Sequence, residues 1–405
     1  MRSKRLILAR SACAAAALFA SLSVQANAGE NGFKVGVLSD MNGYASSTGG
    51  EGSVVAAQLA IDDAGKSING KPIELISGDM QSRPDTAAAL ARNWYDTQNV
   101  DLIVDVPVLS VALAVQAVAR EKHKMLLITA GLTTDLTRSQ CSPWTVQWAD
   151  DTSALAQGTV RALTAQGLEK WFFITADFAF GHALQRDATK VLEAAGGEVV
   201  GSVRAPMQTQ DFASYLLEAQ NSSADVVAFA NASLDTIASV KQAGEFGLQK
   251  TKKLAALLVY ISDVHAIGLQ DAQGLYATSG FYWDTNDATR AFAKRFFEVR
   301  KAMPTKEQAN VYAGLTNYFR ALKETNSNDP DTVTKWLRGH PLDYFGQSTS
   351  LRADGRVMYD LGLYKVKSPE ESKQPWDYYT KVATLSADQA YLPLDTTLCK
   401  SAAEP

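Results

Sequence analysis

The stretch VDLIVDVPVLSVALAVQAVAREKHKMLLITAG, residues 100–131, decides the fold class of this chain. Its two ends, residues 100–107 and 124–131, are short apolar runs rich in Val, Ile and Leu, which is typical of buried strands. Between them, residues 110–122 have the apolar spacing of a helix. A strand, a helix and a second strand in this order predict a β-α-β unit with parallel strands.

The same alternation recurs along most of the chain. Further short apolar runs occupy residues 33–40, 72–79, 170–177, 197–204, 224–231 and 253–260. The segments between them have helical character. Pro84 fits a first helical turn, and Gly167, Gly196 and Gly247 fit helix ends. The pattern predicts an α/β protein with doubly wound parallel sheets.

The number of strands and the chain length predict two lobes rather than one. There are too many strands for one sheet, and the alternation pauses at CSPWTVQWADD, residues 141–151. A chain of this length is also more than a single core supports. We expect lobe 1 to comprise residues 29–148 and 280–348, lobe 2 residues 149–279 and 349–385, and residues 386–405 to form a tail that returns to lobe 1.

The N-terminal stretch MRSKRLILARSACAAAALFASLSVQANA has basic residues, then a short apolar run, then small residues around Asn27. This order predicts a secretory signal cleaved near Ala28, and therefore a periplasmic protein. The apolar run is too short for a transmembrane span. Its removal takes away four basic residues and no acids, which changes the formal net charge from −4 to −8. An acidic chain without basic clusters argues against nucleic acid as a partner.

Two cysteines, Cys141 and Cys399, remain after this cleavage. In an oxidising compartment such a pair favours a disulfide, and the alternative is two unrelated buried thiols. The four histidines are scattered and show no spacing typical of a metal site. We therefore expect neither a metal nor a cofactor.

In open parallel sheets, ligands bind beyond the carboxyl ends of the strands. The segments that follow the predicted strands include NGYASSTGG, QSRP, VLS, GLTT, FAFG, NASL and YISD. Several carry small hydroxyl or amide groups, and three carry aromatic rings. This composition predicts a cleft between the lobes for a small molecule with a polar end and an apolar body.

Four motifs give the chain a likeness to a known family. They are VGVLSDMNG (35–43), ITAGLTTDLT (128–137), ITADFAFGHAL (174–184) and DVVAFANASLDTIASVKQAGEFG (225–247). With them the chain resembles the type I periplasmic solute-binding proteins, in particular the branched-chain amino acid (Leu/Ile/Val) family of ABC importers. LLVYISDVHAIGL (257–269), GFYWD (280–284) and the late cysteine pair resemble the subgroup that binds aromatic and other carboxylic acids.

The resemblance implies a function as well as a fold. It implies two lobes joined by three hinge crossings, which close on a small carboxylate and present it to the permease subunits of a membrane importer. It also implies a monomer without catalytic activity. The chain agrees with this expectation, since it lacks a strand-linked GxGxxG, a P-loop and a GxSxG elbow. A sensor module that feeds a membrane receptor is the alternative of another class.

The resemblance places the ligand carboxylate on two loops of lobe 1. The residues that match those loops are Leu109, Ser110, Gly131, Leu132 and Thr133. We expect ITAGLTT to end a strand and open a helix, where free N–H groups and the helix dipole favour an anion. The alternative is that Thr133 and Thr134 only cap that helix.

Other positions follow from the resemblance around the same cleft. An aromatic residue of the amino-acid binders falls on Thr48 here, with Tyr44 nearby as a substitute. Phe180 matches an aromatic residue that covers the ligand from lobe 2, and Phe178 shares that wall. Asn231 and Ser233 belong to the next loop of lobe 2, for which the alternative is a strand-end turn without a ligand contact.

One departure from the amino-acid binders bears on the ligand. They place an acidic residue near positions 259–260 to pair with the ligand ammonium, and this chain has Val259 and Tyr260 there. A buried ammonium without a counter-charge is strongly disfavoured. We therefore favour an aromatic acid, such as a benzoate or a cinnamate, with Tyr260 against its ring or a substituent. A hydrophobic amino acid is the alternative, and Asp263, the nearest acid, is expected to cap the next helix.

Overall fold

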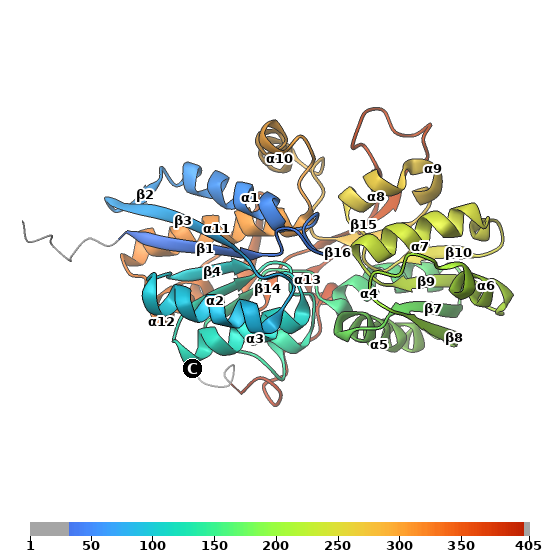
Figure 1. Cartoon of the computed structure of the whole chain (residues 1–405), viewed down its shortest axis with the longest axis horizontal. Helices are drawn as coiled ribbons and strands as arrows, with labels where there is room; N and C mark the ends of the chain where they lie inside the picture. The colour runs from blue at the N-terminus through green and yellow to red at the C-terminus, as the bar shows by residue number, and fades with distance from the viewer. Residues whose placement is uncertain (1–31, 401–405) are drawn as a thin grey trace, which may run out of the picture. The chain divides into compact units, whose positions relative to one another are not determined.

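The computed structural model describes residues 32–400, so the predicted signal segment lies outside the described residues. The first lobe is built on a six-stranded sheet of order β2-β3-β1-β4-β5-β6 (Figure 1). Its strands are β1 (Phe33–Ser39), β2 (Ser67–Ile68), β3 (Lys71–Asp79), β4 (Leu102–Asp105), β5 (Met125–Ile128) and β6 (Thr145–Gln147). All pairs are parallel except β2 with β3. The strand order reverses between β1 and β4, which is where doubly wound sheets bind ligands.

Helices cover both faces of this sheet because its strands are apolar on both sides. Val35, Val37 and Leu127 face the core that α1 and α11 cover. Leu38 and Ile128 face the core that α2 and α3 cover. The helices of this lobe are α1 (Gly50–Asp63), α2 (Pro84–Thr97), α3 (Leu109–Glu121), α10 (Asp287–Arg300), α11 (Lys306–Thr325) and α12 (Pro330–Gly339).

The second lobe is built on a parallel four-stranded sheet of order β10-β9-β7-β8. Its strands are β7 (Lys170–Ala176), β8 (Glu198–Ala205), β9 (Val226–Ala230) and β10 (Lys253–Ala256). Its helices are α4 (Thr152–Thr164), α5 (Ala179–Ala194), α6 (Ala213–Asn221), α7 (Ser233–Glu245), α8 (Ile261–Ile267) and α9 (Leu269–Ala272). The two parallel sheets confirm the predicted fold class.

Two smaller antiparallel sheets complete the lobes. Strands β11 (Tyr276–Ser279), β15 (Leu361–Val366) and β16 (Tyr379–Leu385) form one sheet, and β11 contacts α4 and β10 of lobe 2. Strands β12 (Leu342–Tyr344), β13 (Gln347–Leu351) and β14 (Val357–Met358) form the other, which contacts α11 and α12 of lobe 1. Short helical turns η1 (Asp135–Thr137) and η2 (Leu248–Lys250) lie between these elements, and α13 (Ala387–Ala390) follows β16.

The chain passes between the lobes after β6, after β11 and after β14. Because β13 and β14 pair with each other and β12 pairs with β13, the third passage follows Met358. The sequence expectation put this boundary between residues 348 and 349. We therefore propose a later boundary for lobe 1, which keeps the whole of this small sheet in one lobe.

Buried charges hold the three passages together. The carboxylate of Asp150, from the first passage, accepts hydrogen bonds from Lys306 Nζ at 2.8 Å, the Gly280 amide at 3.1 Å and the Tyr359 hydroxyl at 2.8 Å. Arg356 is buried and donates to Asp151 at 2.7 Å. A buried ion pair is costly to break because either charge would be left without a partner. These contacts give the hinge a defined geometry.

The end of the described chain contacts lobe 1 at Cys141, whereas α13 contacts α4 of lobe 2, so the return of residues 386–405 to lobe 1 stays a prediction. The sulfur atoms of Cys141 and Cys399 form a disulfide, with their Cα atoms 5.6 Å apart. Arg138 and Asp395 form an ion pair at 3.0 Å beside it. Between residues 32 and 400, no helix has both the length and the apolar character that a membrane crossing requires.

Candidate functional site

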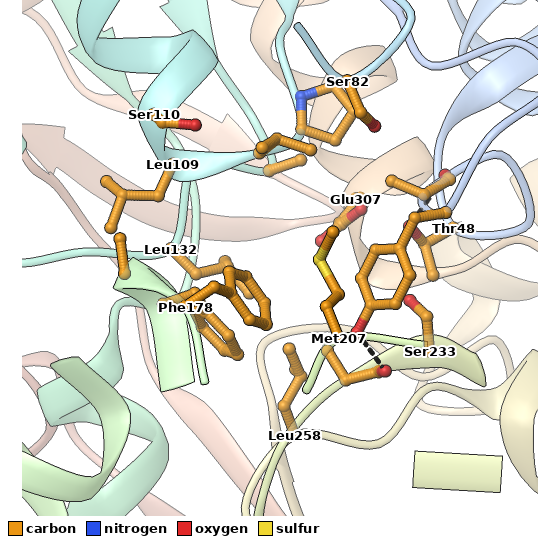
Figure 2. A pocket seen from close by; sticks show the side chains of 18 of the residues that line it. Thr48, Ser82, Leu109, Ser110, Leu132, Phe178, Met207, Ser233, Leu258 and Glu307 are labelled. Carbon is orange, nitrogen blue, oxygen red and sulfur yellow. Dashed lines mark hydrogen bonds between the residues drawn. The ribbon is translucent and has the colours of Figure 1, made fainter. Parts of the chain in front are cut away.

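A cavity of about 210 Å³ lies where the carboxyl ends of the strands of both lobes face each other (Figure 2). Most of its lining residues belong to loops that directly follow parallel strands of the two sheets. From lobe 1 its lining includes Tyr44, Ala45, Thr48, Ser82, Pro107, Val108, Leu109, Ser110, Ala130, Leu132 and Glu307. From lobe 2 it includes Phe178, Ala179, Phe180, Met207, Ala232, Ser233, Leu258 and Tyr260.

Most of the residues that the sequence analysis selected line this cavity. Those nine residues are Tyr44, Thr48, Leu109, Ser110, Leu132, Phe178, Phe180, Ser233 and Tyr260. The structure does not bring Gly131, Thr133 or Asn231 to the lining. The loops are therefore placed as expected, and the differences concern which atoms of each loop reach the cavity.

The loop that contains Thr133 differs from the expectation in its conformation. No α-helix follows β5, and the segment has only the short turn η1, so the expected helix start at ITAGLTT is wrong. The Thr133 hydroxyl accepts from the Asp135 amide at 3.2 Å. The side chain of Gln147 donates to the carbonyl oxygens of Gly131, at 2.7 Å, and Thr133, at 2.9 Å. The Thr133 hydroxyl and the Gly131 and Thr133 carbonyl groups are thus bonded within the protein, and Leu132 lines the cavity.

Asn231 is held inside lobe 2 rather than at the cavity. Its side-chain amide donates to Ser239 at 3.1 Å and accepts from the Thr236 hydroxyl at 2.9 Å. These bonds tie the end of β9 to the first turns of α7. The strand-end turn that the sequence analysis kept as the alternative describes this residue, and Ser233, at the start of α7, lines the cavity instead.

Helix α3 begins at the cavity after a strained segment of backbone. Asp105, Val106 and Val108 have φ values of 88°, 58° and 114°. Positive φ is a real outlier for a β-branched residue, and such strain persists mainly at functional sites. It aims the start of α3, with Leu109 and the exposed Ser110, at the cavity. The first N–H groups of a helix have no acceptor within it and attract an anion.

The wall on the lobe 2 side is aromatic. The rings of Phe178 and Phe180 lie 6.0 Å apart, and the ring of Tyr44 meets Phe178 edge-on at 6.2 Å. The hydroxyl of Tyr44, in lobe 1, donates to the Ala232 carbonyl of lobe 2. Aromatic rings at these distances provide a large apolar surface with defined geometry.

Glu307 is a cavity residue that the sequence analysis missed. It lies in the first turn of α11, is 2% exposed and accepts a hydrogen bond from the Tyr260 hydroxyl. Burial raises the pKa of Glu307 to about 8, an effect that the bond from Tyr260 only partly offsets. The sequence does contain a signal for it, since Thr305 and Gln308 form a capping box that fixes the helix start at residue 306.

The cavity lining holds no lysine or arginine among residues 32–400. Lys306, the residue before Glu307, forms an ion pair with Asp150 at the hinge and does not line the cavity. Asp263 does not line the cavity, and its carboxylate accepts from the Tyr260 amide at 3.0 Å as the cap of α8, as the sequence predicts. Burial raises the pKa of Asp263 to about 7.

One group of potential metal ligands lies away from this cavity. His123, Asp329 and Asp331 are exposed, and their ligand atoms lie within 4.8 Å of one another. His123 already contacts Asp331 at 2.9 Å, and the Trp144 indole donates to Asp331 at 2.7 Å. An ion at this position would have to replace those contacts. Sequence spacing could not reveal the group because its members are far apart in the chain.

Comparisons with known proteins place this geometry in a family. Residues 32–373 match the model of the periplasmic binding protein family. A periplasmic binding protein from Burkholderia mallei is 43% identical, with a TM-score of 0.87 over 90% of this chain and 97% of its own. A branched-chain amino acid ABC transporter periplasmic ligand-binding protein from Burkholderia xenovorans LB400 is 37% identical, with a TM-score of 0.82 over 89% of this chain and 97% of its own.

A more distant protein shares the fold. It is a solute-binding protein of an ABC transporter from R. palustris, in complex with 4-hydroxybenzoate. It is 20% identical, with a TM-score of 0.79 over 88% of this chain and 97% of its own. The likeness at this identity concerns the arrangement of the elements alone.

Proposed function

We propose, from the premise that this chain belongs to the periplasmic binding protein family, that it traps a small aromatic carboxylate between its lobes. It is a periplasmic solute-binding protein of the ABC transporter type. In our proposal it delivers this acid, as a monomer, to the permease subunits of an importer.

The ligand carboxylate docks at the start of α3, where Leu109 and Ser110 line the cavity. The N–H groups of that first turn supply hydrogen-bond donors, and the helix dipole adds a favourable field. The Ser110 hydroxyl adds a further donor. The cavity lining has no cationic side chain among the described residues, so in this proposal the backbone N–H groups and the helix dipole stabilise the anion.

The ring of the ligand lies against Phe178 and Phe180, with Leu132 and Leu258 around it. Figure 2 shows Leu109, Ser110 and Leu132 on one side of the cavity, and Thr48 and Ser233 on the other. A ligand with its carboxylate near Ser110 therefore extends its apolar body across the aromatic wall. An extended ring compound fits this distribution of polar ends and apolar middle.

The protonation of Glu307 is the observation that favours a carboxylic acid without an amino group as the ligand. The sequence argument considered only residues 259–260 and 263, and so it missed this buried carboxyl group. Because burial raises the pKa of Glu307 to about 8, the group is mainly neutral at pH 7. A neutral carboxyl group gives a ligand ammonium no counter-charge, whereas it is compatible with an uncharged ring substituent.

A hydrophobic amino acid is the second candidate ligand, because Glu307 could pair with its ammonium group. An ammonium within about 4–6 Å of Glu307 would lower the pKa of this residue and stabilise its ionised form. The pair would then be buried, and both charges would lose their hydration. This cost makes the amino acid the less favoured ligand.

A thermal-shift screen on refolded protein, free of co-purified ligand, tests the proposal. A ligand at about 100 times its dissociation constant stabilises the folded state by about 2.7 kcal/mol. We expect benzoates, phenylacetate or hydroxycinnamates to raise the melting temperature, and leucine, isoleucine and valine to leave it unchanged. A shift with the three amino acids alone would contradict the proposed ligand class.

A further inference from the structure

Glu307 lines the cavity, and its carboxyl group has one oxygen in a hydrogen bond and one buried oxygen without a partner. Oε1 accepts from the Tyr260 hydroxyl. Oε2 is buried and has no hydrogen-bond partner among the described residues, since the nearby Thr48 hydroxyl donates to the Ala45 carbonyl at 3.1 Å instead. A buried polar atom without a partner costs about 1–3 kcal/mol, so such atoms in a native protein call for an explanation.

Local contacts fix Glu307 in place. Thr305 caps α11, accepting from the Gln308 amide at 3.3 Å, and its hydroxyl donates to the Thr48 carbonyl at 2.6 Å. On the other side, Lys306 is bound to Asp150 at 2.8 Å. These contacts fix the backbone on both sides of Glu307, and the bond from Tyr260 holds its carboxyl group. Oε2 is therefore a buried polar atom with a defined position in a residue that lines the cavity.

We infer that Glu307 Oε2 binds an oxygen substituent of the ligand ring, at the end opposite the ligand carboxylate. This inference rests on the proposed function and narrows its substrate class to hydroxylated aromatic acids. Thr305, at the start of the same helix, donates to the Thr48 carbonyl, and Figure 2 shows Thr48 on the side of the cavity opposite Ser110.

The chemistry of the carboxyl group explains why a hydroxyl group fits. In the neutral form, with Oε1 accepting from Tyr260, the proton resides on Oε2 and can be donated to a ligand oxygen. Burial raises the pKa of Glu307, which favours this form. A phenolic hydroxyl group accepts that proton, and it donates instead when the carboxyl group is ionised, so it is satisfied in both states.

A purely structural role for Glu307 accounts for the hydrogen bond to Oε1 but not for the buried Oε2. If Glu307 served only to hold Tyr260, a second partner for Oε2 would be expected within the protein, as most buried polar atoms have one. A site built to bind a hydroxyl group also discriminates strongly against a ligand that lacks it, because its own polar atoms are then left without a partner.

Titration calorimetry with benzoate, 3-hydroxybenzoate and 4-hydroxybenzoate tests the inference. The wild-type protein should bind the better hydroxybenzoate at least about tenfold more tightly than benzoate, which corresponds to about 1.4 kcal/mol. The Glu307→Leu variant should lose this preference, so that it binds benzoate and the hydroxybenzoates with similar affinities. Glu307→Gln, which retains a donor and an acceptor, should keep most of the preference.

The outcomes separate the inference from the proposed function. If benzoate binds the wild type as tightly as both hydroxybenzoates, the inference is overturned whether or not the variants fold. If Glu307→Leu weakens all three acids equally, Glu307 has a structural role and the inference is also overturned. If none of the three acids binds and leucine does, the proposed ligand class fails first. Melting temperatures of the variants, measured without ligand, serve as the folding control.

Discussion

The hydroxyl group of Tyr260 donates a hydrogen bond to Glu307 across the cleft between the two lobes. Tyr260 precedes α8 in lobe 2, and Glu307 belongs to the first turn of α11 in lobe 1. Both residues line the cavity. The bond therefore links the closure of the lobes to a carboxyl group that lines the cavity.

Removal of this bond should favour the open state. We expect Tyr260→Phe to increase the radius of gyration of the ligand-free protein in small-angle X-ray scattering, because closure loses a contact that exists only when the lobes meet. Tyr215→Phe, in α6 and outside the cavity lining, is the matched control. Identical scattering of the two variants would show that the Tyr260–Glu307 bond has no part in closure.

The raised pKa of Glu307 predicts a pH dependence of stability. The usual value of 4.5 is raised to about 8, so between these values the folded protein holds a proton that the unfolded chain has released. The free energy of unfolding must then fall as pH rises through this window, by at most about 1.4 kcal/mol per pH unit from this group.

Chemical denaturation of the wild type and Glu307→Gln at pH 5, 6.5 and 8 measures this effect. The variant does not titrate at position 307, so its stability should fall less steeply over the window. Asp263, with its pKa raised to about 7, contributes equally to both proteins. Parallel curves for the two proteins would mean that Glu307 titrates normally.

Phe178 should contribute to ligand binding more than to folding. Its side chain is half-buried and contacts Tyr44 and Phe180 at the cavity wall. We expect Phe178→Ala to weaken the binding of an aromatic acid by about tenfold or more, since a ring–ring contact contributes about 0.5–1.5 kcal/mol beyond its buried area. The control is Phe246→Ala, which removes a phenylalanine that is 40% exposed and does not line the cavity. Equal affinities of the two variants would remove Phe178 from the ligand wall.

The Cys141–Cys399 disulfide should stabilise the folded protein by closing a long loop. The two residues are 258 positions apart, and constraints on loops of more than about 100 residues are expected to contribute up to about 5 kcal/mol. The Cys141→Ser/Cys399→Ser double variant of the chain from residue 29 should therefore melt at a lower temperature, with ligand affinity unchanged. A thiol titration of the wild-type chain from residue 29, unfolded without reductant, should detect no free thiol. Two free thiols would contradict the bond.

The fold was predictable because its signal is local. Runs such as residues 33–40 and 170–177 are mainly apolar on both faces, as strands buried between two layers of helices require, and the structure places β1 and β7 there. The small sheet of β12, β13 and β14 was not predicted. Its strands are short and amphipathic, and their pairing depends on contacts with α11 and α12 that no local pattern encodes.

The candidate site was predictable to the level of loops but not of atoms. Residues after the strand ends, such as Ser110 and Phe178, reach the cavity because parallel strands deliver their following loops to one edge. Thr133 does not reach the cavity, because the side chain of Gln147, 14 residues later, donates a hydrogen bond to its carbonyl oxygen and holds the loop within the lobe. Glu307 was missed because it reaches the cavity from a helix rather than from a strand end, and its surroundings are set by tertiary packing.

A crystal structure of the complex with the aromatic acid that gives the largest thermal shift tests the central claim most directly. The account predicts that the ligand carboxylate lies within hydrogen-bond distance of the first-turn N–H groups at Leu109 and Ser110, with the ring against Phe178 and Phe180. A ligand bound with its carboxylate at Glu307 and Tyr260, or outside this cavity, would contradict it.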